Sequence, residues 1–405
     1  NKHSIDSIPE ARKKDYYYEI LTEGQYAKEL RLYNIASIMR QRYNALWKKL
    51  AGEREKIFIK GFKNLAFASI LSGLYSFLIY KTSVGEITVS ELAAFSSAVL
   101  IISNSFSGIV SSFLNFKMVY VDLILAVRTF FNWKNEGEGE DNGEATIAKD
   151  NQQLEIEFRD VSFTYPNTDN VVLDHLSFTI RSGEKVALVG VNGAGKSTIV
   201  KLLLRLYEPS SGVIRINGID YRNIDINAYR KCFAVCFQNI AHYALSLQEN
   251  IALSNIENSI DMDKIVEVAR QSGLAELYEG WDEKLQTSMS RDFDSNGVNL
   301  SGGQWQKVGI ARTFFRNAPF VILDEPSAAL DPFAERQVFS SFAKLCGDKS
   351  GILISHRLSS IMLVDRILFL KNGKISEEGT HEELMSLQGE YAEMYSLQSQ
   401  QYKDA

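Results

Sequence analysis

The segment GVNGAGKS, residues 190–197, constrains the fold of this chain more than any other stretch. It follows the apolar run VALV, which is typical of a buried strand, and it precedes TIVKLLLRLY, which is typical of a helix. Glycines at such a turn leave backbone N–H groups bare, and the positive end of the helix points to the same place. The segment therefore predicts a loop that cradles the phosphates of a nucleotide.

Each residue type in this loop has its own expected task. The amine of Lys196 would reach the β- and γ-phosphates, and the hydroxyl of Ser197 would be a ligand of Mg²⁺. The expected nucleotide-binding residues are Gly190, Asn192, Gly193, Gly195, Lys196, Ser197 and Thr198. A tight strand-to-helix turn without a ligand is the alternative.

A second motif, FVILDE at 320–325, supplies two carboxylates after an apolar strand. Asp324 is placed to hold Mg²⁺, and Glu325 directly after it could polarise a water molecule against the γ-phosphate. The alternative is a strand end that is merely solvated. Because an intact phosphate loop accompanies the pair, the sequence favours a catalytic site.

The sequence LSGGQ at 300–304 is a second glycine-rich helix start. Ser301 and Gln304 have the spacing of a capping box, so a capped helix with nothing bound is the simplest reading. Gly302 and Gly303, however, each cost a helix about 1 kcal/mol, and they clear side chains from the first N–H groups. A bare helix end of this kind can bind phosphate.

The sequence pattern and the composition narrow the class of protein further. Short β-rich runs alternate with helical stretches from Leu154 onward, which indicates an α/β domain with a mainly parallel sheet. The net charge of −6 provides no basic field for a polyanion, so no nucleic-acid partner is expected. The three cysteines, Cys232, Cys236 and Cys346, lack metal-site spacing and are expected to be buried thiols.

The part of the chain before Leu154 has a different sequence pattern from the α/β domain. Residues 25–51 contain no proline or glycine, so one long helix is expected there. Uncharged runs of 17 residues (64–80) and 25 residues (92–116) follow, with lysines or arginines on both outer flanks. They predict membrane helices at about 61–80 and 88–116. A buried hairpin in a soluble protein is the alternative, and the serines of the second run could serve helix packing or line a substrate path.

The motifs together resemble the ATP-binding-cassette (ABC) family. The phosphate loop, LSGGQ, FVILDE, SAALD and LISHR occur in that family's order within residues 154–400. The resemblance implies a P-loop domain with a helical signature subdomain that binds ATP and Mg²⁺. It also implies a dimer in which Ser301, Gly302, Gly303 and Gln304 of one copy close over ATP held by the other.

Four further residues take roles from the same resemblance. Tyr165 resembles the aromatic residue that stacks on adenine, although it could equally pack on strand neighbours. Gln238 resembles the glutamine that touches Mg²⁺ and the attacking water. His356 resembles the histidine on the γ-phosphate, and Asp331 resembles the aspartate that communicates across the dimer.

The chain as a whole resembles the C-terminal part of an ABC exporter, a multi-pass protein of the bacterial cell membrane with its cassette in the cytoplasm. Residues 1–134 would be a partial transmembrane domain, 135–153 an acidic linker and 154–405 the cassette. Residues 15–21 would form a coupling helix on a partner's cassette, and further membrane helices are expected upstream.

The expected partners are membrane lipid and a second exporter half, identical rather than different. The cassette resembles those of bacterial peptide and lantibiotic exporters, so the expected cargo is a peptide. A lipid or drug exporter and a soluble ABC ATPase are the alternatives.

Overall fold

The computed structural model describes residues 8–50, 154–255, 261–325, 346–347, 349–355 and 364–403, and the isolated positions 80, 84, 105, 108 and 112. By its internal contacts the chain divides into two units. The first comprises Asn1–Thr22 and Arg40–Glu140, and the second comprises Glu23–Met39 and Asp141–Ala405. Residues 23–39 therefore belong with the C-terminal part of the chain, although they lie near its start.

The first unit contains α2 (Ile8–Thr22) and the helical residues 40–50. Lys49 Nζ lies 2.5 Å from Glu10 Oε1 and joins the two helical stretches at the surface. Residues 15–21, the expected coupling helix, lie within α2. Their docking on a partner's cassette stays a prediction.

The expected membrane helices, 61–80 and 88–116, and the linker 135–153 lie outside the described residues except for positions 80, 105, 108 and 112. Of the helices that the structure does describe, none combines the length and the apolar character needed to cross a membrane.

The prediction of one long helix over 25–51 is wrong. Helix α3 (Ala27–Tyr33) ends at Asn34, whose φ of 53° is left-handed, and helical structure resumes at residue 36. Asparagine tolerates this conformation better than most residues, because its short polar side chain can hydrogen-bond locally. The absence of proline and glycine therefore did not guarantee continuity.

The second unit is built on a six-stranded sheet in the order β10-β9-β3-β8-β7-β6. All neighbouring pairs are parallel except β9 and β10, which run antiparallel. The strands are β3 (Lys185–Gly190), β6 (Phe233–Cys236), β7 (Phe320–Asp324), β8 (Ser350–Ile354), β9 (Arg366–Lys371) and β10 (Lys374–Gly379). Every residue of β6, β7 and β8 is buried, as expected when both faces of a parallel sheet are covered.

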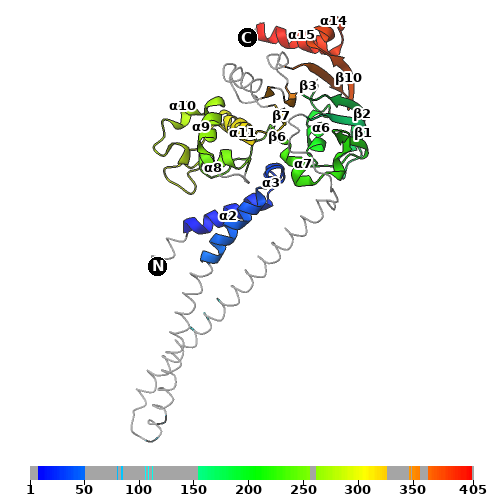
Figure 1. The fold of residues 1–405 in the computed structure, drawn as a ribbon. Coiled ribbons are helices and arrows are strands. Elements are labelled where there is room, and N and C mark those ends of the chain that lie inside the picture. The colour runs from blue at the N-terminus through cyan, green and yellow to red at the C-terminus, as the bar shows by residue number, and fades with distance from the viewer. Residues whose placement is uncertain are drawn as a thin grey trace. The chain divides into compact units, whose positions relative to one another are not determined.

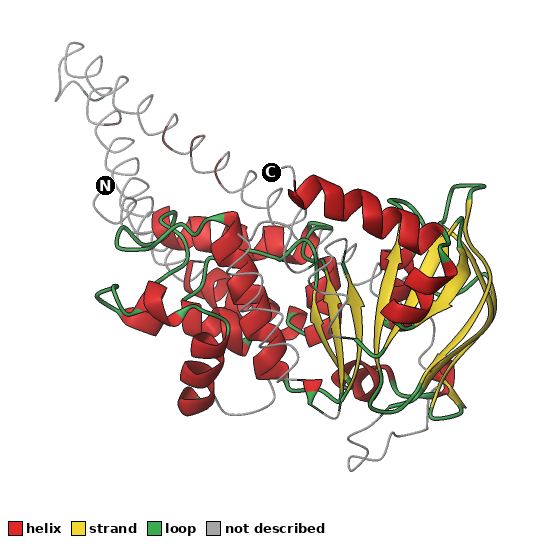
Figure 2. Ribbon diagram, turned by 90° about the horizontal axis from the view of Figure 1, so that it is seen from above, coloured by secondary structure: helices red, strands yellow, loops and turns green. Residues whose placement is uncertain are grey.

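A second, antiparallel sheet has the order β2-β1-β4-β5. Its strands are β1 (Ile156–Thr164), β2 (Val171–Ile180), β4 (Ser211–Ile216) and β5 (Ile219–Asp220). The burial of β1 alternates along much of the strand, so one face packs on the core and the other is solvated. Figure 2 shows the two sheets as separate groups of strands. The α/β fold with a mainly parallel sheet is confirmed, and the antiparallel sheet adds to it.

The described helical elements after residue 154 fall into three groups. A lobe beside β6 and β7 contains α8 (Leu247–Ala252), α9 (Met262–Gln271), α10 (Ala275–Tyr278), η2 (Lys284–Gln286) and α11 (Gly302–Arg316) (Figure 1). Close to the antiparallel sheet and β3 lie α6 (Lys196–Leu203), η1 (Tyr221–Asn223) and α7 (Ile226–Lys231). At the C-terminal end, α14 (His381–Leu387) and α15 (Glu390–Lys403) lie next to β10.

The lobe shares one hydrophobic core with β6, β7 and β8, because α11 packs between them. Trp305, Phe314 and Phe315 of α11 join Val321 of β7 in this core. The lobe corresponds to the predicted helical signature subdomain. Cys232, Cys236 and Cys346 are all buried and unbonded to one another, and burial raises the pKa of Cys232 to about 11.

Candidate nucleotide-binding site

The phosphate loop joins the end of β3 to the start of α6, as the sequence predicts. Gly190 has a φ of 147°, and a Cβ there would lie 2.1 Å from the carbonyl oxygen of Leu370, so only glycine fits. Gly193 and Gly195 have φ values of 82° and 103°. These positive φ values are ones that glycine adopts readily, and turns of this kind can direct successive N–H groups at an anion.

Lys196 lies at the centre of the loop and is 5% exposed. Its Nζ donates hydrogen bonds to the carbonyl oxygens of Gly190 at 2.7 Å and Val191 at 3.0 Å. Burial lowers the pKa of this amine, while the charges of Glu325 and Asp324 act in the opposite direction. A phosphate would supply the lysine with a charged acceptor that two carbonyl groups only partly replace.

Ser197 and Asp324 meet beside the lysine. Ser197 Oγ donates to Asp324 Oδ1 over 3.2 Å, which joins the first turn of α6 to the end of β7. Burial and the neighbouring charge of Glu325 raise the pKa of Asp324 to about 6, against a smaller opposing effect of the Ser197 hydroxyl. A buried carboxylate with a raised pKa favours a cation beside it.

Glu325 is held in an unusual backbone conformation. Its φ is 49°, in the left-handed region, and its N–H donates to the carbonyl oxygen of Ile354 at 3.0 Å. Non-glycine residues in this region cost about 1 kcal/mol or more and often occur at functional sites. Gln238 Nε2 donates to Glu325 Oε2 at 2.7 Å, so the two predicted catalytic residues are in direct contact.

Tyr165 packs on its neighbours and also contacts the phosphate-loop helix. Its ring meets Phe163 and Tyr207 edge-on at 4.9 and 5.3 Å. Its hydroxyl lies 3.0 Å from Thr198 Oγ1 and accepts a hydrogen bond from Lys201 Nζ at 2.9 Å. This position is compatible with packing on strand neighbours and with stacking on adenine. Adenine stacking stays a prediction.

The signature segment forms a capping box at the start of α11. Ser301 Oγ accepts from Gln304 N at 3.3 Å, and Gln304 Oε1 accepts from Ser301 N at 2.8 Å. Ser301 and Gly302 are exposed. Because α11 belongs to the helical lobe and α6 lies near the antiparallel sheet, the two glycine-rich helix starts come from different parts of the fold (Figure 1). Asp331 and His356 lie outside the described residues.

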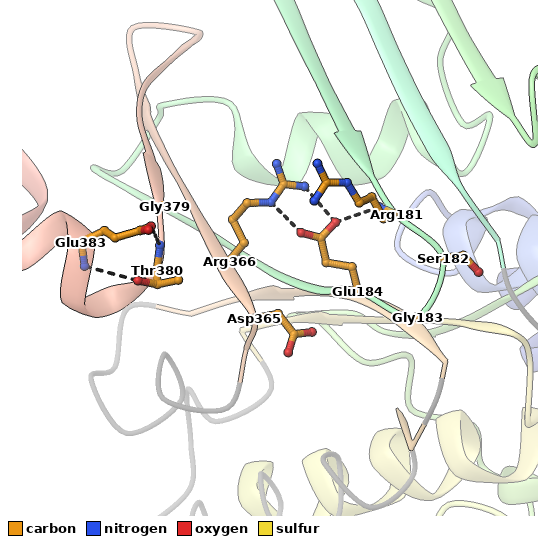
Figure 3. A pocket seen from close by; sticks show the side chains of 9 residues that line it. All are labelled: Arg181, Ser182, Gly183, Glu184, Asp365, Arg366, Gly379, Thr380 and Glu383. Carbon is orange, nitrogen blue, oxygen red and sulfur yellow. Dashed lines mark hydrogen bonds and ion pairs between the residues drawn. The ribbon is translucent and has the colours of Figure 1, made fainter.

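A polar pocket of about 470 Å³ lies at the opposite ends of the strands, where β3 and β9 begin. Arg366 binds the carboxylate of Glu184 there with Nε at 2.6 Å and Nη2 at 2.9 Å (Figure 3). It also pairs with Glu378. The phosphate loop follows the other end of β3. These charged residues therefore tie β3, β9 and β10 together and take no part in the nucleotide site.

Sequence reasoning missed a buried ion pair between α3 and α11. Arg312 Nη1 lies 3.0 Å from Glu29 Oε2, and the two side chains are 2% and 7% exposed. Glu29 shares a helical face with Tyr26 and Tyr33, at spacings of three and four residues, and all three are buried. This spacing was the available signal, but a glutamate on such a face is usually solvated.

The described nucleotide site defines a P-loop nucleoside triphosphatase domain: a phosphate loop, a buried lysine, a Ser–Asp pair and a Glu–Gln pair converge at the ends of β3 and β7. The sequence profile of the family described as "ABC transporter" matches residues 173–328.

Several relatives extend the match to most of the chain. Subtilin transport ATP-binding protein SpaT of Bacillus subtilis is 35% identical over 92% of this chain and 61% of its own length. Nisin transport ATP-binding protein NisT of Lactococcus lactis is 31% identical over 97% of this chain and 65% of its own length. An ATP-dependent lipid A-core flippase of Coxiella burnetii is 38% identical over 68% of this chain and 46% of its own length.

A solved structure gives the same result. A bacterial Atm1-family ABC exporter with ATP bound superimposes with a TM-score of 0.60 at 25% identity, over 98% of this chain and 66% of that chain. The second unit carries the ATPase cassette of the ABC transporter family, and over most of its length the chain is similar to ABC exporters. It spans less than two thirds of the length of these relatives.

Proposed function

We propose that this chain acts as half of a dimeric exporter that uses ATP to move a peptide across the cytoplasmic membrane. The observation that carries the proposal is the contact between Gln238 and Glu325 beside the Ser197–Asp324 pair. These contacts support the proposal, because a candidate base and a carboxylate that could hold a metal follow each other in the chain, and the charges of both act on the phosphate-loop lysine. The uncharged runs at 64–80 and 92–116 support a membrane location.

The residues fit Mg²⁺ as a cofactor. Ser197 and Asp324 offer two oxygen ligands, and a bound cation would counteract the burial and the Glu325 charge that raise the pKa of Asp324. Within the described ranges no group of three or more His, Cys, Asp or Glu side chains gathers as a metal site, so phosphate and water oxygens would complete the shell. Bound Mg²⁺ would neutralise charge on the phosphates during transfer.

Each protein group then has a defined part in hydrolysis. Lys196 exchanges its two carbonyl partners for phosphate oxygens and binds the nucleotide. Glu325 accepts a proton from the attacking water, and Gln238 orients the glutamate through their hydrogen bond. The left-handed backbone at Glu325 fixes where its carboxylate points. His356 and Asp331 complete this set as residues on the γ-phosphate and at the dimer contact.

A second copy completes each site in this proposal. The exposed helix start at Ser301 and Gly302 would close over ATP that the partner's phosphate loop holds, with a helix dipole directed at the γ-phosphate. ATP would thereby favour the closed dimer, since it contacts both copies only in that state. Tyr165 would support the adenine, and hydrolysis would release the two cassettes.

The peptide cargo is supported by the similarity to the subtilin and nisin transport proteins. A lipid cargo is the second candidate, because lipid A-core flippases match at comparable identity. The two are separated by transport in inside-out vesicles that contain the full-length protein. ATP-dependent uptake of a lantibiotic-type precursor peptide, with none in Glu325→Gln vesicles, supports the proposal. Lipid translocation without peptide uptake contradicts it.

A further inference from the structure

The tyrosine expected at the adenine is tied to the helix that follows the phosphate loop. The hydroxyl of Tyr165 lies 3.0 Å from Thr198 Oγ1 and accepts a hydrogen bond from Lys201 Nζ at 2.9 Å. Thr198 and Lys201 are three positions apart in α6, so they lie on one face of this helix. Tyr165 itself comes directly after β1. Its side chain therefore joins the end of β1 to the first two turns of α6.

The ammonium group of Lys201 contacts both the hydroxyl and the ring of Tyr165. Its Nζ lies 4.9 Å from the centroid of the ring, which is within the range of a cation–π contact. Because the ammonium group donates to the phenol oxygen, the phenol O–H remains available to donate to Thr198. The Lys201 side chain is partly buried. One lysine thus fixes the place of the hydroxyl and also restricts the ring.

The aromatic neighbours of Tyr165 leave a parallel stacking partner to be supplied by a ligand. Within the described residues the ring contacts two others, Phe163 and Tyr207, at interplanar angles of 82° and 88°. Both contacts are edge-on. A planar base could stack in the parallel, offset arrangement that neither of these side chains uses.

The charge of Lys201 also acts on the metal side of the nucleotide site. Lys201 lies five residues after Lys196, or about 7.5 Å further along α6. Burial is the main influence on the pKa of Asp324 and raises it, and the charge of Lys201 is one of the smaller influences that lower it. The same ammonium group therefore acts on the tyrosine expected at the base and on the carboxylate expected at the metal.

We infer that Lys201 is a positioning residue of the nucleotide site: it holds the ring of Tyr165 against α6, at a fixed distance from the phosphate loop, so that the base of the nucleotide adds to the affinity. The inference rests on the proposed ATP site, in which Tyr165 supports the adenine, but not on the cargo. Among the described residues the Lys201 amine hydrogen-bonds to Tyr165 alone. Its loss should therefore weaken recognition of the base and spare the phosphates.

The test compares the binding of ADP and of inorganic pyrophosphate to Lys201→Met and wild-type full chain in lipid nanodiscs. ADP contains the base, and pyrophosphate presents only the phosphate part. Both are titrated calorimetrically with Mg²⁺ at pH 7.5, above the pKa of about 6 of Asp324, so that this carboxyl is ionised in both proteins. Lys201→Met should bind ADP about fivefold more weakly, the size expected for one partly exposed cation–π contact, and pyrophosphate within about twofold of wild type.

Two further variants control for the charge and for the kind of contact. Lys201→Arg keeps a cation and its donors, so it should recover most of the ADP affinity. Lys264→Met is the matched control, because Lys264 is also partly buried and its Nζ lies 5.0 Å from the ring of Phe315, in the helical lobe. It should bind both ligands as wild type does. An equal loss of ADP affinity in this control would overturn the inference.

A double-variant cycle tests whether Lys201 acts through the tyrosine. Tyr165→Phe keeps the ring and removes the oxygen, so it should also weaken ADP about fivefold. Lys201→Met combined with Tyr165→Phe should be no weaker than either single variant, because both remove one shared contact. Fully additive losses would overturn the inference. So would wild-type ADP affinity in Lys201→Met, or an equal weakening of ADP and pyrophosphate.

Two readouts separate a positioning role from a structural one and from failure of the proposed site. The titrations also count sites per chain, and a fall in that number with an unchanged Kd would mean a structural role and overturn the inference. At saturating ATP the turnover of Lys201→Met should stay within about twofold of wild type while KM rises. Tyr165→Ala that binds ADP as tightly as wild type would contradict the proposed adenine support. A loss in Tyr165→Ala with none in Lys201→Met would overturn only the role of the lysine.

Discussion

Replacement of Glu325 by glutamine tests the chemistry of the site most sharply, because the change is isosteric. The backbone N–H of residue 325 would still donate to Ile354, and Gln238 would still have an oxygen to bind. Only the negative charge and the proton-accepting capacity are lost. Loss of a general base costs about 10²- to 10⁴-fold in rate, or about 3–5 kcal/mol in the barrier.

The same change should alter the pH dependence of metal binding in a definite direction. Asp324 has its pKa raised from 3.8 to about 6, a difference of about 3 kcal/mol, first by burial and second by the charge of Glu325. Removal of that charge lowers the pKa of Asp324, although burial, the larger cause of its raised value, remains. Asp324 must be ionised to hold Mg²⁺, so Mg²⁺-dependent ATP binding is lost as pH falls through the pKa.

The assay is a pair of titrations. ATP hydrolysis is followed by phosphate release at pH 7.5, and Mg²⁺-dependent binding of a fluorescent ATP analogue is followed from pH 7.5 to 5. Glu325→Gln should bind ATP normally, hydrolyse it at least 100-fold more slowly, and retain Mg²⁺-dependent binding to a lower pH than wild type. Hydrolysis within tenfold of wild type would refute the reasoning. So would loss of Mg²⁺-dependent binding at a higher pH in the variant than in wild type.

Four other substitutions follow from the same geometry. Lys196→Ala should abolish binding of a fluorescent ATP analogue while the unfolding temperature holds, because within the described residues the buried amine bonds only to two carbonyl groups; retained affinity would count against the phosphate loop as the site. Gly190→Ala places a Cβ 2.1 Å from the Leu370 oxygen and should destabilise the second unit by about 1–3 kcal/mol in urea unfolding. In Gly193→Ala nothing lies within 4 Å of the new Cβ, so its cost should be smaller, and equal losses would show that the clash is irrelevant. Ser301→Arg should leave ATP binding intact and stop turnover, and undiminished turnover would exclude Ser301 from the closed site.

The strands that are buried on both faces could be predicted from the sequence, because such strands are continuous apolar runs. VALV and FVIL are continuous apolar runs, and the structure places them as β3 and β7 of the parallel sheet. The contacts of Ser197 with Asp324 and of Gln238 with Glu325 also follow from motifs that end such strands. Parallel strands end at one edge of a sheet, so local motifs there are brought together by topology alone.

Three features of the structure could not be predicted from the sequence. The break at Asn34 is one local backbone angle, and nothing in the surrounding helical pattern requires it. The burial of Glu29 depends on Arg312, nearly three hundred positions later, and a single sequence does not pair them. The antiparallel sheet was missed because the alternation along β1 is irregular, with register shifts against both of its neighbours.

The central claim is that each nucleotide site is completed by a second copy, and mixed dimers of two differently tagged chains test it directly. In one mixture Lys196→Ala and Ser301→Arg are in opposite copies, which leaves one intact site if the phosphate loop of one copy meets the signature helix of the other. In the second mixture both changes are in the same copy, opposite a wild-type chain, which damages both composite sites. The account predicts ATP hydrolysis by the first mixed dimer and none by the second. Hydrolysis by the second and none by the first would mean that each chain forms its site alone, and would contradict the account.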